Sequence, residues 1–129
     1  MGDGQDIRLR SSGESLPVNA DPRRVQQVFL NLLSNALQHG ASPRGVDVQV
    51  RRDDHFALVE VIDYGRGVPA EDREKVFERF YQVDETDSRG LGVGLYLVHA
   101  IVVAHGGRVE VQTTEPQGAT FVVRLPLAE

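Results

Sequence analysis

The segment NLLSNALQHG, residues 31–40, decides the fold of this chain. It is the second half of a stretch in which apolar residues recur every three or four positions, the period of a helix with one buried face. Asp21 followed by Pro22 is typical of a helix N-terminus, and Gly40 after His39 is typical of a C′ glycine. We therefore predict an amphipathic helix from Asp21 to His39. Its apolar stripe consists of Val25, Val28, Phe29, Leu32, Leu33, Ala36 and Leu37.

Two asparagines, Asn31 and Asn35, lie four residues apart in this helix and therefore on one face, at the border of the apolar stripe. Asparagine is a mediocre helix former because its amide competes for nearby backbone groups. The pair either caps neighbouring loops or faces a polar ligand held against the helix. The helix alone leaves both interpretations open.

Composition limits the class of protein. A chain of 129 residues is enough for one domain and too short for two. A net charge of −5 argues against a nucleic-acid surface, and the absence of cysteine excludes disulfides and thiolate metal sites. No apolar run or leader pattern indicates a membrane span or a signal peptide, so we expect a cytoplasmic domain. Residues 1–5 are interpreted as a cloning remnant or a linker, and residues 6–129 as the domain.

The remaining segments predict a two-layer α/β sandwich, with a mixed, mostly antiparallel sheet and helices on one face. Residues 6–12 and 16–20 are expected to form a hairpin through Gly13. A short helix is predicted over residues 70–78, a loop over 80–90, and a second apolar helix over 91–105, closed by two glycines. The other predicted strands are two antiparallel pairs, residues 46–52 with 55–63 and residues 108–114 with 119–125.

The first chemical signal is DYGRGVP, residues 63–69. Strand alternation directs Asp63 toward the core, where a carboxylate requires partners. Gly65 and Gly67 then remove side chains, as they would where a flat ligand lies against the backbone. The alternative is an ordinary turn in which the aspartate is a local cap.

The second signal is RGLGVGL, residues 89–95, which opens the second predicted helix. Glycines at a helix N-terminus let backbone N–H groups approach an anion such as phosphate. A P-loop is excluded because its lysine is absent here, and the dinucleotide fingerprint should follow a strand. A flexible glycine hinge is the other interpretation. The four histidines have no ligand spacing, so we expect no zinc site.

Together these segments resemble the catalytic ATP-binding domain of sensor histidine kinases, a Bergerat-type fold in the GHKL superfamily, which includes gyrase and mismatch-repair ATPases. The resemblance covers nearly the whole chain from Asp6 onward. Its motifs are the N box with Asn31 and Asn35, the first glycine box (DYGRGVP), the F box (FERF, residues 77–80), the second glycine box (GLGVGL, residues 90–95) and the closing strands (HGGRVEV and GATFVVRLPL).

The resemblance implies a site for ATP and Mg²⁺. Asp63 would accept a hydrogen bond from the adenine amino group, helped by Thr120 through water, and would reject guanine, which carries a carbonyl there. Asn35 would supply an oxygen to Mg²⁺, and Asn31 would complete the polar edge. Arg79 and Arg89 would compensate phosphate charge. The other implied nucleotide-binding residues are Gln38, His39, Gly65, Gly67, Val68, Tyr81, Gly90, Leu91, Gly92, Val93, Gly94 and Leu95.

Asn31 separates a kinase from a hydrolase within this resemblance. The superfamily's ATPases carry a water-activating glutamate four residues before the magnesium asparagine, and an amide cannot accept that proton. The chain departs from the family at Gln38, where a phosphate-binding lysine is common, and at His39, where an aromatic residue is common. The first departure predicts a lower affinity for ATP or more reliance on Arg89.

No histidine in the chain has the acidic neighbour that follows the family's acceptor histidine. We therefore expect an excised catalytic domain that binds ATP and does not phosphorylate itself, with a dimerisation and phosphoacceptor domain of the same kinase as partner and a response regulator as indirect partner. The isolated domain is expected to be a monomer, and the parent a homodimer in the cytoplasm or anchored to a membrane. The alternatives are a stand-alone ATPase, a serine kinase of the anti-sigma type, and a degenerate domain that binds only a partner.

Overall fold

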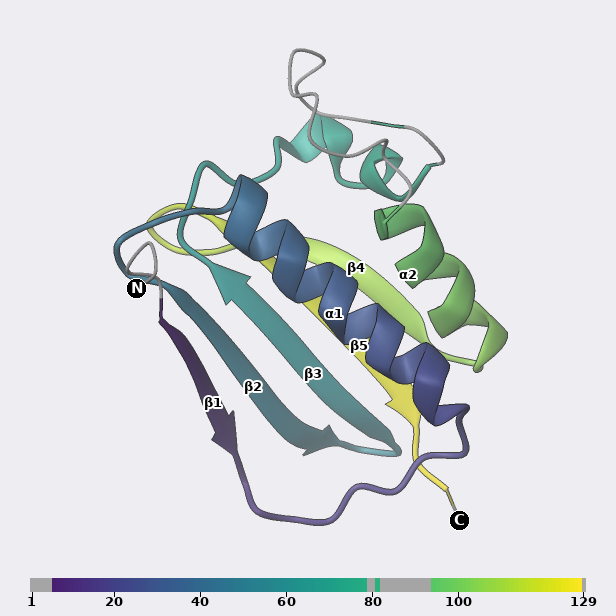
Figure 1. Cartoon of the computed structure of the whole chain (residues 1–129). Coiled ribbons are helices and arrows are strands. Elements are labelled where there is room, and N and C mark those ends of the chain that lie inside the picture. The colour runs from purple at the N-terminus through teal and green to yellow at the C-terminus, as the bar shows by residue number, and fades with distance from the viewer. Residues whose placement is uncertain (1–5, 79–80, 82–93, 129) are drawn as a thin grey trace.

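The computed structural model describes residues 6–78, 81 and 94–128. A five-stranded mixed sheet of order β1-β2-β3-β5-β4 forms one layer. Two helices form the other, and they cover the face of the sheet at β3, β5 and β4 (Figure 1). The predicted two-layer sandwich is confirmed. The elements are β1 (Ile7–Ser11), α1 (Pro22–His39), β2 (Val46–Asp53), β3 (Phe56–Asp63), η1 (Ala70–Asp72), η2 (Lys75–Phe77), α2 (Gly94–Ala104), β4 (Arg108–Thr113) and β5 (Ala119–Pro126).

Helix α1 begins and ends where the sequence predicts. The carboxylate of Asp21 accepts a hydrogen bond from the backbone N–H of Arg23, which satisfies a donor that the first turn leaves without a partner. Along the predicted stripe, Val28, Leu32 and Ala36 are buried. Leu32 is fully buried in a core that also contains Phe121, the third residue of β5. Burial of this stripe fixes which face of α1 meets the sheet, and hence where the two asparagines point.

The predicted hairpin of residues 6–12 with 16–20 is wrong. Strand β1 instead pairs in parallel with β2, with Ile7 opposite Val46. Residues 16–20 contain no strand, and Val18 makes one isolated bridge to Leu127 near the C-terminus. Alternation correctly predicted that β1 is extended. Its partner strand, β2, comes after α1 in the sequence, so the local turn at Gly13 gave no information about which strand pairs with β1.

The short helix predicted over residues 70–78 is confirmed only in part, because the segment is helical in two pieces and not in one. Two 3₁₀ turns, η1 and η2, occupy this segment, and their hydrogen bonds span three residues, as in Glu78 N–H to the Lys75 carbonyl at 2.9 Å. Phe77 of η2 packs edge-on against Phe121 with ring centroids 6.1 Å apart, and lies 5.8 Å from the ring of His99. Phe77 therefore docks this segment onto the core beside α2. The predicted loop over residues 80–90 lies outside the described residues, apart from Tyr81.

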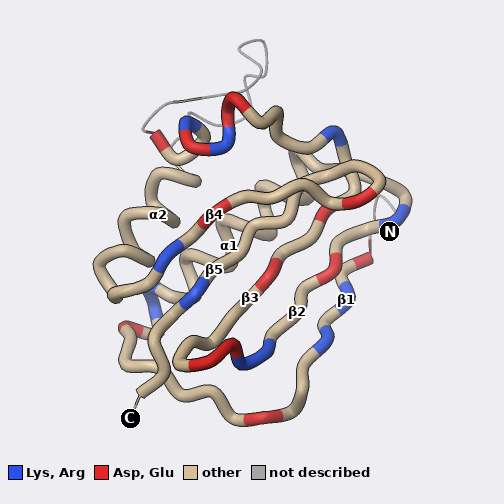
Figure 2. The backbone as a smooth tube through the Cα atoms, turned by 180° about the vertical axis from the view of Figure 1, so that it is seen from behind, with Lys and Arg blue, Asp and Glu red and all other residues tan. Residues whose placement is uncertain are grey.

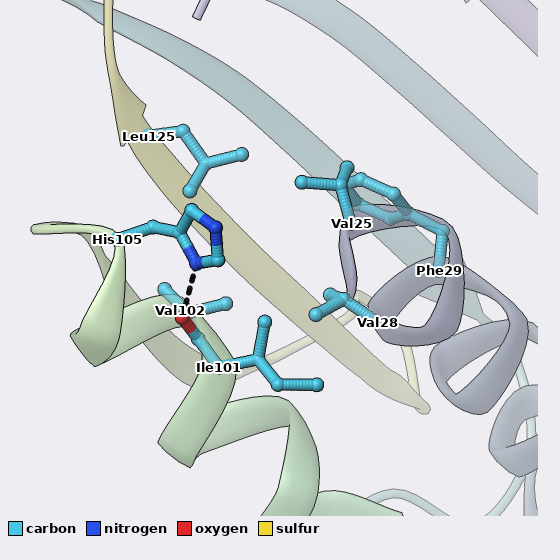
Figure 3. A pocket seen from close by; sticks show the side chains of 7 residues that line it. All are labelled: Val25, Val28, Phe29, Ile101, Val102, His105 and Leu125. Atoms are coloured by element: carbon cyan, nitrogen blue, oxygen red, sulfur yellow. Dashed lines mark hydrogen bonds between the residues drawn. The ribbon is translucent and has the colours of Figure 1, made fainter. Parts of the chain in front are cut away.

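His105, directly after the last residue of α2, links the C-terminal end of α2 to the N-terminal end of α1. Its Nδ1 lies 2.8 Å from the Ile101 carbonyl (Figure 3). Its Nε2 lies 3.2 Å from the backbone N of Asp21. Because a backbone N–H can only donate, Nε2 is the acceptor and Nδ1 carries the proton. The ring lies among closely packed apolar side chains of α1, α2 and β5, at a shallow hollow with no room for a water molecule. No residue of the predicted nucleotide site lines this hollow.

The sheet's other face carries no helix in the described residues, and charged residues mark its strands (Figure 2). No helix in that described part is both long and apolar enough to span a membrane. Ion pairs join neighbouring strands on the open face, including Arg8 with Asp47 at 2.7 Å and Arg124 with Glu110 at 3.0 Å. The chemistry of the predicted site therefore lies on the opposite, helix-covered face, at the end of the sheet where β3 stops and α1 finishes.

Candidate functional site

Asp63 is the last residue of β3 and the centre of the candidate site. It is only 3% exposed, and it lies on the same face of β3 as Val59 and Val61, which pack in the core. The prediction that strand alternation turns this carboxylate inward is confirmed. A buried carboxylate is costly unless hydrogen bonds replace the water that it loses.

Two backbone N–H groups supply those hydrogen bonds. Gly65 donates to Oδ1 of Asp63 at 3.1 Å, and Ala119, the first residue of β5, donates to the same oxygen at 3.0 Å. Burial raises the pKa of Asp63, and the hydrogen bonds from Ala119 and Gly65 act in the opposite direction. Among the described residues both donors reach Oδ1, so Oδ2 is the oxygen that remains for a ligand.

The C-terminal end of α1 lies directly against this carboxylate, and glycines make the close approach possible. A Cβ at Gly40 would lie 2.2 Å from Cγ of Asp63, and a Cβ at Gly65 would lie 2.5 Å from Cα of Gly40. The predicted reason for Gly40 was a left-handed helix cap, but its φ is −110°, a value open to any residue. Close approach to Asp63 is what requires glycine here.

The predicted reason for Gly67 also changes. Its φ is +78°, and a Cβ there would lie 2.8 Å from the carbonyl oxygen of Gly118. Backbone packing against the turn before β5 thus accounts for this glycine without a ligand. Val68 follows it and packs against the core. Contact of Gly65, Gly67 or Val68 with a nucleotide stays a prediction.

The asparagine pair lies where α1 meets the start of α2. Both side chains are half-buried, and Nδ2 of Asn31 donates to the carbonyl oxygen of Gly94, the first residue of α2, at 3.4 Å. This contact leaves the amide oxygen of Asn31 directed elsewhere. The side chain of Asn35 makes no hydrogen bond to any of the described residues. Their position fits the ligand-facing interpretation, and their contact with a metal or a nucleotide stays a prediction.

The other predicted positions on the two helices have different surroundings. Gln38 is exposed, and His39 is half-buried at the last position of α1. Gly94 is exposed, and a Cβ there would meet no atom within 4 Å. Leu95 is half-buried and packs against the core, so its visible role is structural.

The structure gives Tyr81 and Thr120 partners other than a nucleotide. The hydroxyl of Tyr81 donates to Asp72, a bond that raises the pKa of Tyr81 to about 12, and its ring packs against the core. Thr120 shares a 2.8 Å hydrogen bond with the hydroxyl of Thr114. Because Thr120 is opposite Ile62 in the sheet, it points to the face away from Asp63. Thr120 is therefore not brought together with the carboxylate that it was predicted to assist.

Six of the predicted residues lie outside the described part of the chain, so the structure places none of them: Arg79, Arg89, Gly90, Leu91, Gly92 and Val93. Within the described part, no group of three or more His, Cys, Asp or Glu side chains could hold a metal ion. The oxygens available for a hard cation at the N box are amides.

Sequence reasoning missed two features of the site. The first is Ala119, whose N–H group holds Asp63 although the two residues are 56 positions apart. The second is Gly40, which was assigned to the helix end alone. One signal was available in the sequence, since an inward carboxylate at a strand end requires backbone donors, and the turn before β5 supplies small residues.

Comparison with known proteins identifies the family of this chain. Residues 20–129 match the family described as histidine kinase-, DNA gyrase B-, and HSP90-like ATPase. The chain is 42% identical over 108 residues to the signal transduction histidine-protein kinase AfsQ2 of Streptomyces coelicolor, covering 82% of this chain and 20% of that protein. It is 36% identical over 129 residues to the sensor histidine kinase CusS of Escherichia coli, covering 98% of this chain and 27% of that protein.

A solved structure shows the same arrangement. ShkA, crystallised at full length in complex with AMPPNP, superposes with a TM-score of 0.84 at 33% identity, covering 97% of this chain and 26% of that chain. The chain spans only about a fifth to a quarter of the length of AfsQ2, CusS and ShkA. The likeness is thus to one domain of these multidomain proteins.

Proposed function

The chain belongs to the histidine kinase-, DNA gyrase B- and HSP90-like ATPase family, with sensor histidine kinases as its relatives, and from this we propose that it binds ATP with Mg²⁺ and positions the γ-phosphate for transfer to a histidine of another domain. That acceptor histidine would lie on the dimerisation domain of the same two-component kinase, whose catalytic part works in the cytoplasm. A response regulator would then receive the phosphate.

The buried carboxylate of Asp63 carries this proposal. Its Oδ1 is engaged by two backbone donors, so its Oδ2 can accept one more hydrogen bond in a fixed direction. The adenine amino group is such a donor. Guanine carries a carbonyl at the matching position, and two acceptors would then face each other without water. The site therefore supports recognition of adenine in preference to guanine.

The N box supports the phosphate end of the proposal. Amide oxygens of Asn35 and Asn31 suit Mg²⁺, a hard cation that prefers oxygen ligands and would neutralise phosphate charge when bound. The side-chain amide nitrogen of Asn31 donates a hydrogen bond to the carbonyl oxygen of Gly94, and this bond links α1 to the start of α2. An amide at this position cannot take a proton from water at neutral pH, so the chain's own residues favour transfer over hydrolysis.

Calorimetry with Mg·ATP and Mg·GTP tests nucleotide binding and base selectivity. We expect saturable binding of Mg·ATP and much weaker binding of Mg·GTP. Equal affinity for the two nucleotides would reject the role of Asp63, and no binding of either at millimolar concentration would favour a degenerate domain that binds only a partner.

A reconstituted transfer assay tests the reaction. Mixed with a separately produced phosphoacceptor domain, the chain should transfer the γ-phosphate of ATP to histidine, which acid-labile labelling detects. The chain alone should release little inorganic phosphate. Asn31→Glu supplies the missing carboxylate and should raise that release. Steady turnover by the unaltered chain alone would support a stand-alone ATPase, and labelling of a serine on a partner would support a serine kinase.

A further inference from the structure

A second cluster of charged and aromatic side chains lies behind the candidate site, on the open face of the sheet. It joins Arg8 of β1, Arg44 before β2, Asp47 of β2, and Tyr64 directly after β3. Strand alternation puts Asp47 and Tyr64 on the face opposite to Asp63. None of these residues was predicted to touch the nucleotide.

Asp47 is the centre of this cluster and is only 8% exposed. Its carboxylate accepts a hydrogen bond from Nε of Arg8 at 2.7 Å and another from the hydroxyl of Tyr64. The hydrogen bond from Arg8, and then that from Tyr64, lowers the pKa of Asp47, so the carboxylate is ionised at neutral pH. Hydrogen bonds to an ionised acceptor are stronger than neutral ones.

Tyr64 is held at three points. Its hydroxyl is bound by Asp47, its ring is covered by the guanidinium of Arg44 at 3.9 Å from the centroid, and its carbonyl accepts a hydrogen bond from Nε2 of Gln117 at 3.4 Å. A Cβ on Gly118 would lie 2.8 Å from Cα of Tyr64, so the turn before β5 also presses against its backbone.

This restraint bears directly on Asp63. The hydrogen bond from Gly65 to Oδ1 of Asp63 closes a turn with Tyr64 as its middle residue. The conformation of Tyr64 therefore decides whether that bond forms and where Oδ2 points. We propose that Tyr64, anchored by Asp47, is a positioning residue that holds the Asp63–Gly65 turn in the conformation that accepts the nucleotide base. This inference rests on the proposed function.

The size of the effect follows from the population of the competent turn. If the anchor is lost, the apparent dissociation constant rises by the factor by which the competent fraction falls. A hydrogen bond to an ionised group changes an equilibrium by about tenfold to 100-fold, and a neutral one by about threefold to tenfold. The effect should appear as weaker ATP binding. It should also appear, before any nucleotide is added, as more frequent opening of the hydrogen bond from the Gly65 N–H to Asp63.

Tyr64→Phe and Asp47→Asn test the anchor. Tyr64→Phe removes the hydroxyl and keeps the stacked ring, and Asp47→Asn keeps the shape and removes the charge. Glu110→Gln is the matched control, since it breaks the ion pair with Arg124 at the β4–β5 side of the same face. Calorimetry gives the dissociation constants for Mg·ATP, amide hydrogen exchange gives the opening of Gly65, and thermal melting reports the global stability.

We expect Tyr64→Phe to bind Mg·ATP about tenfold to 100-fold more weakly and to exchange the Gly65 amide faster by a similar factor. Asp47→Asn, whose amide oxygen still accepts a weaker bond, should show a smaller loss in the same direction. The double variant should bind no more weakly than Tyr64→Phe alone, because both substitutions act on the same bond. Glu110→Gln should change neither quantity. Wild-type ATP affinity and wild-type Gly65 exchange in both variants, with only a lower melting temperature, would overturn the inference.

Failure of the two proposals can be told apart. If the wild type binds no ATP, the proposed function fails, and Gly65 exchange alone then decides whether the anchor holds the turn. If the wild type binds ATP and the anchor variants match Glu110→Gln, the inference fails while the function stands. If Tyr64→Phe does not fold, Asp47→Asn gives the same decision, because it leaves the tyrosine in place.

Discussion

Asp63→Asn should separate binding from stability. The amide oxygen of asparagine can replace Oδ1 and still accept the hydrogen bonds from Gly65 and Ala119. The amide nitrogen then stands where Oδ2 stood. The adenine amino group would face another donor, so the contact that selects adenine becomes a repulsive one. The hydrogen bonds that hold this side chain in the fold are therefore kept, while the oxygen that would accept the adenine amino group is lost.

The loss of affinity can be sized from this one contact. A hydrogen bond to a charged group contributes about 1.5–3 kcal/mol, which corresponds to an affinity for ATP about 10-fold to 100-fold weaker. Guanine presents a carbonyl at that position, so the variant should bind GTP no worse than the wild type does. The ATP-over-GTP preference, measured by calorimetry with the Mg²⁺ complexes, should fall by at least the loss in ATP affinity.

Stability should change in the opposite sense. Burial raises the pKa of Asp63 above its ordinary value of 3.8, so the folded state holds this proton more tightly than the unfolded state. The stabilisation from that proton is complete below the ordinary value and is lost as the pH rises through the higher folded value. Above that window the ionised carboxylate costs stability, and asparagine does not. In urea titrations, the free energy of unfolding of Asp63→Asn should increase relative to that of the wild type as the pH rises from the ordinary pKa of aspartate through the higher folded pKa of Asp63.

Asp54→Asn is the matched control, because this side chain is 81% exposed and its φ of 59° suits asparagine equally well. It should bind ATP normally and show no comparable pH-dependent gain. Wild-type ATP affinity in Asp63→Asn would refute the adenine contact. A loss of stability that is the same at every pH would refute the claim that the buried charge is costly.

Three substitutions elsewhere test the framework around the site. Leu32→Ala removes a fully buried side chain and should lower the free energy of unfolding by about 3–5 kcal/mol in urea titrations. Gly40→Ala puts a methyl 2.2 Å from Cγ of Asp63 and should cost about 1–3 kcal/mol in thermal melts, whereas Gly94→Ala, with no atom within 4 Å, should cost nothing; equal effects would contradict the close approach. His105→Ala removes the acceptor for the Asp21 N–H at the start of α1 and should cost about 0.5–1.5 kcal/mol by urea unfolding, and no loss would show that the link between the helices is unimportant.

Local chemistry made most of the fold predictable. The period of the α1 stripe and the Asp21–Pro22 start fixed the helix bounds, and the antiparallel pairing of β2 with β3 and of β4 with β5 was correct. Both pairs are joined by short turns, so their partners are close in sequence. The partner of β1 lies beyond α1, and period-two alternation carries no information about which strand is adjacent. The predicted hairpin failed for that reason.

The candidate site was predictable only in part. The inward direction of Asp63 follows from alternation along one strand. Its donor Ala119 comes from a strand that ends the chain, so only the folded sheet reveals it. The same register explains the miss at Thr120, which is one position away from Ala119 and therefore on the other face. The resemblance assigned Thr120 to Asp63, and the register of β5 places the N–H group of Ala119 there instead.

The contacts around Asp63 indicate why so many glycines converge there. A carboxylate can be buried only if backbone donors come close to it, and backbones come close only where side chains are absent. Gly40, Gly65 and Gly118 each leave no room for a Cβ against Asp63 or its neighbours. The glycine pattern therefore follows first from holding one charge in place, and a nucleotide base would use the oxygen that this arrangement leaves. Substitutions that neutralise the buried charge of Asp63 should raise the stability of the domain and weaken ATP binding. Substitutions that add a side chain at these glycines should lower both the stability and the affinity for ATP.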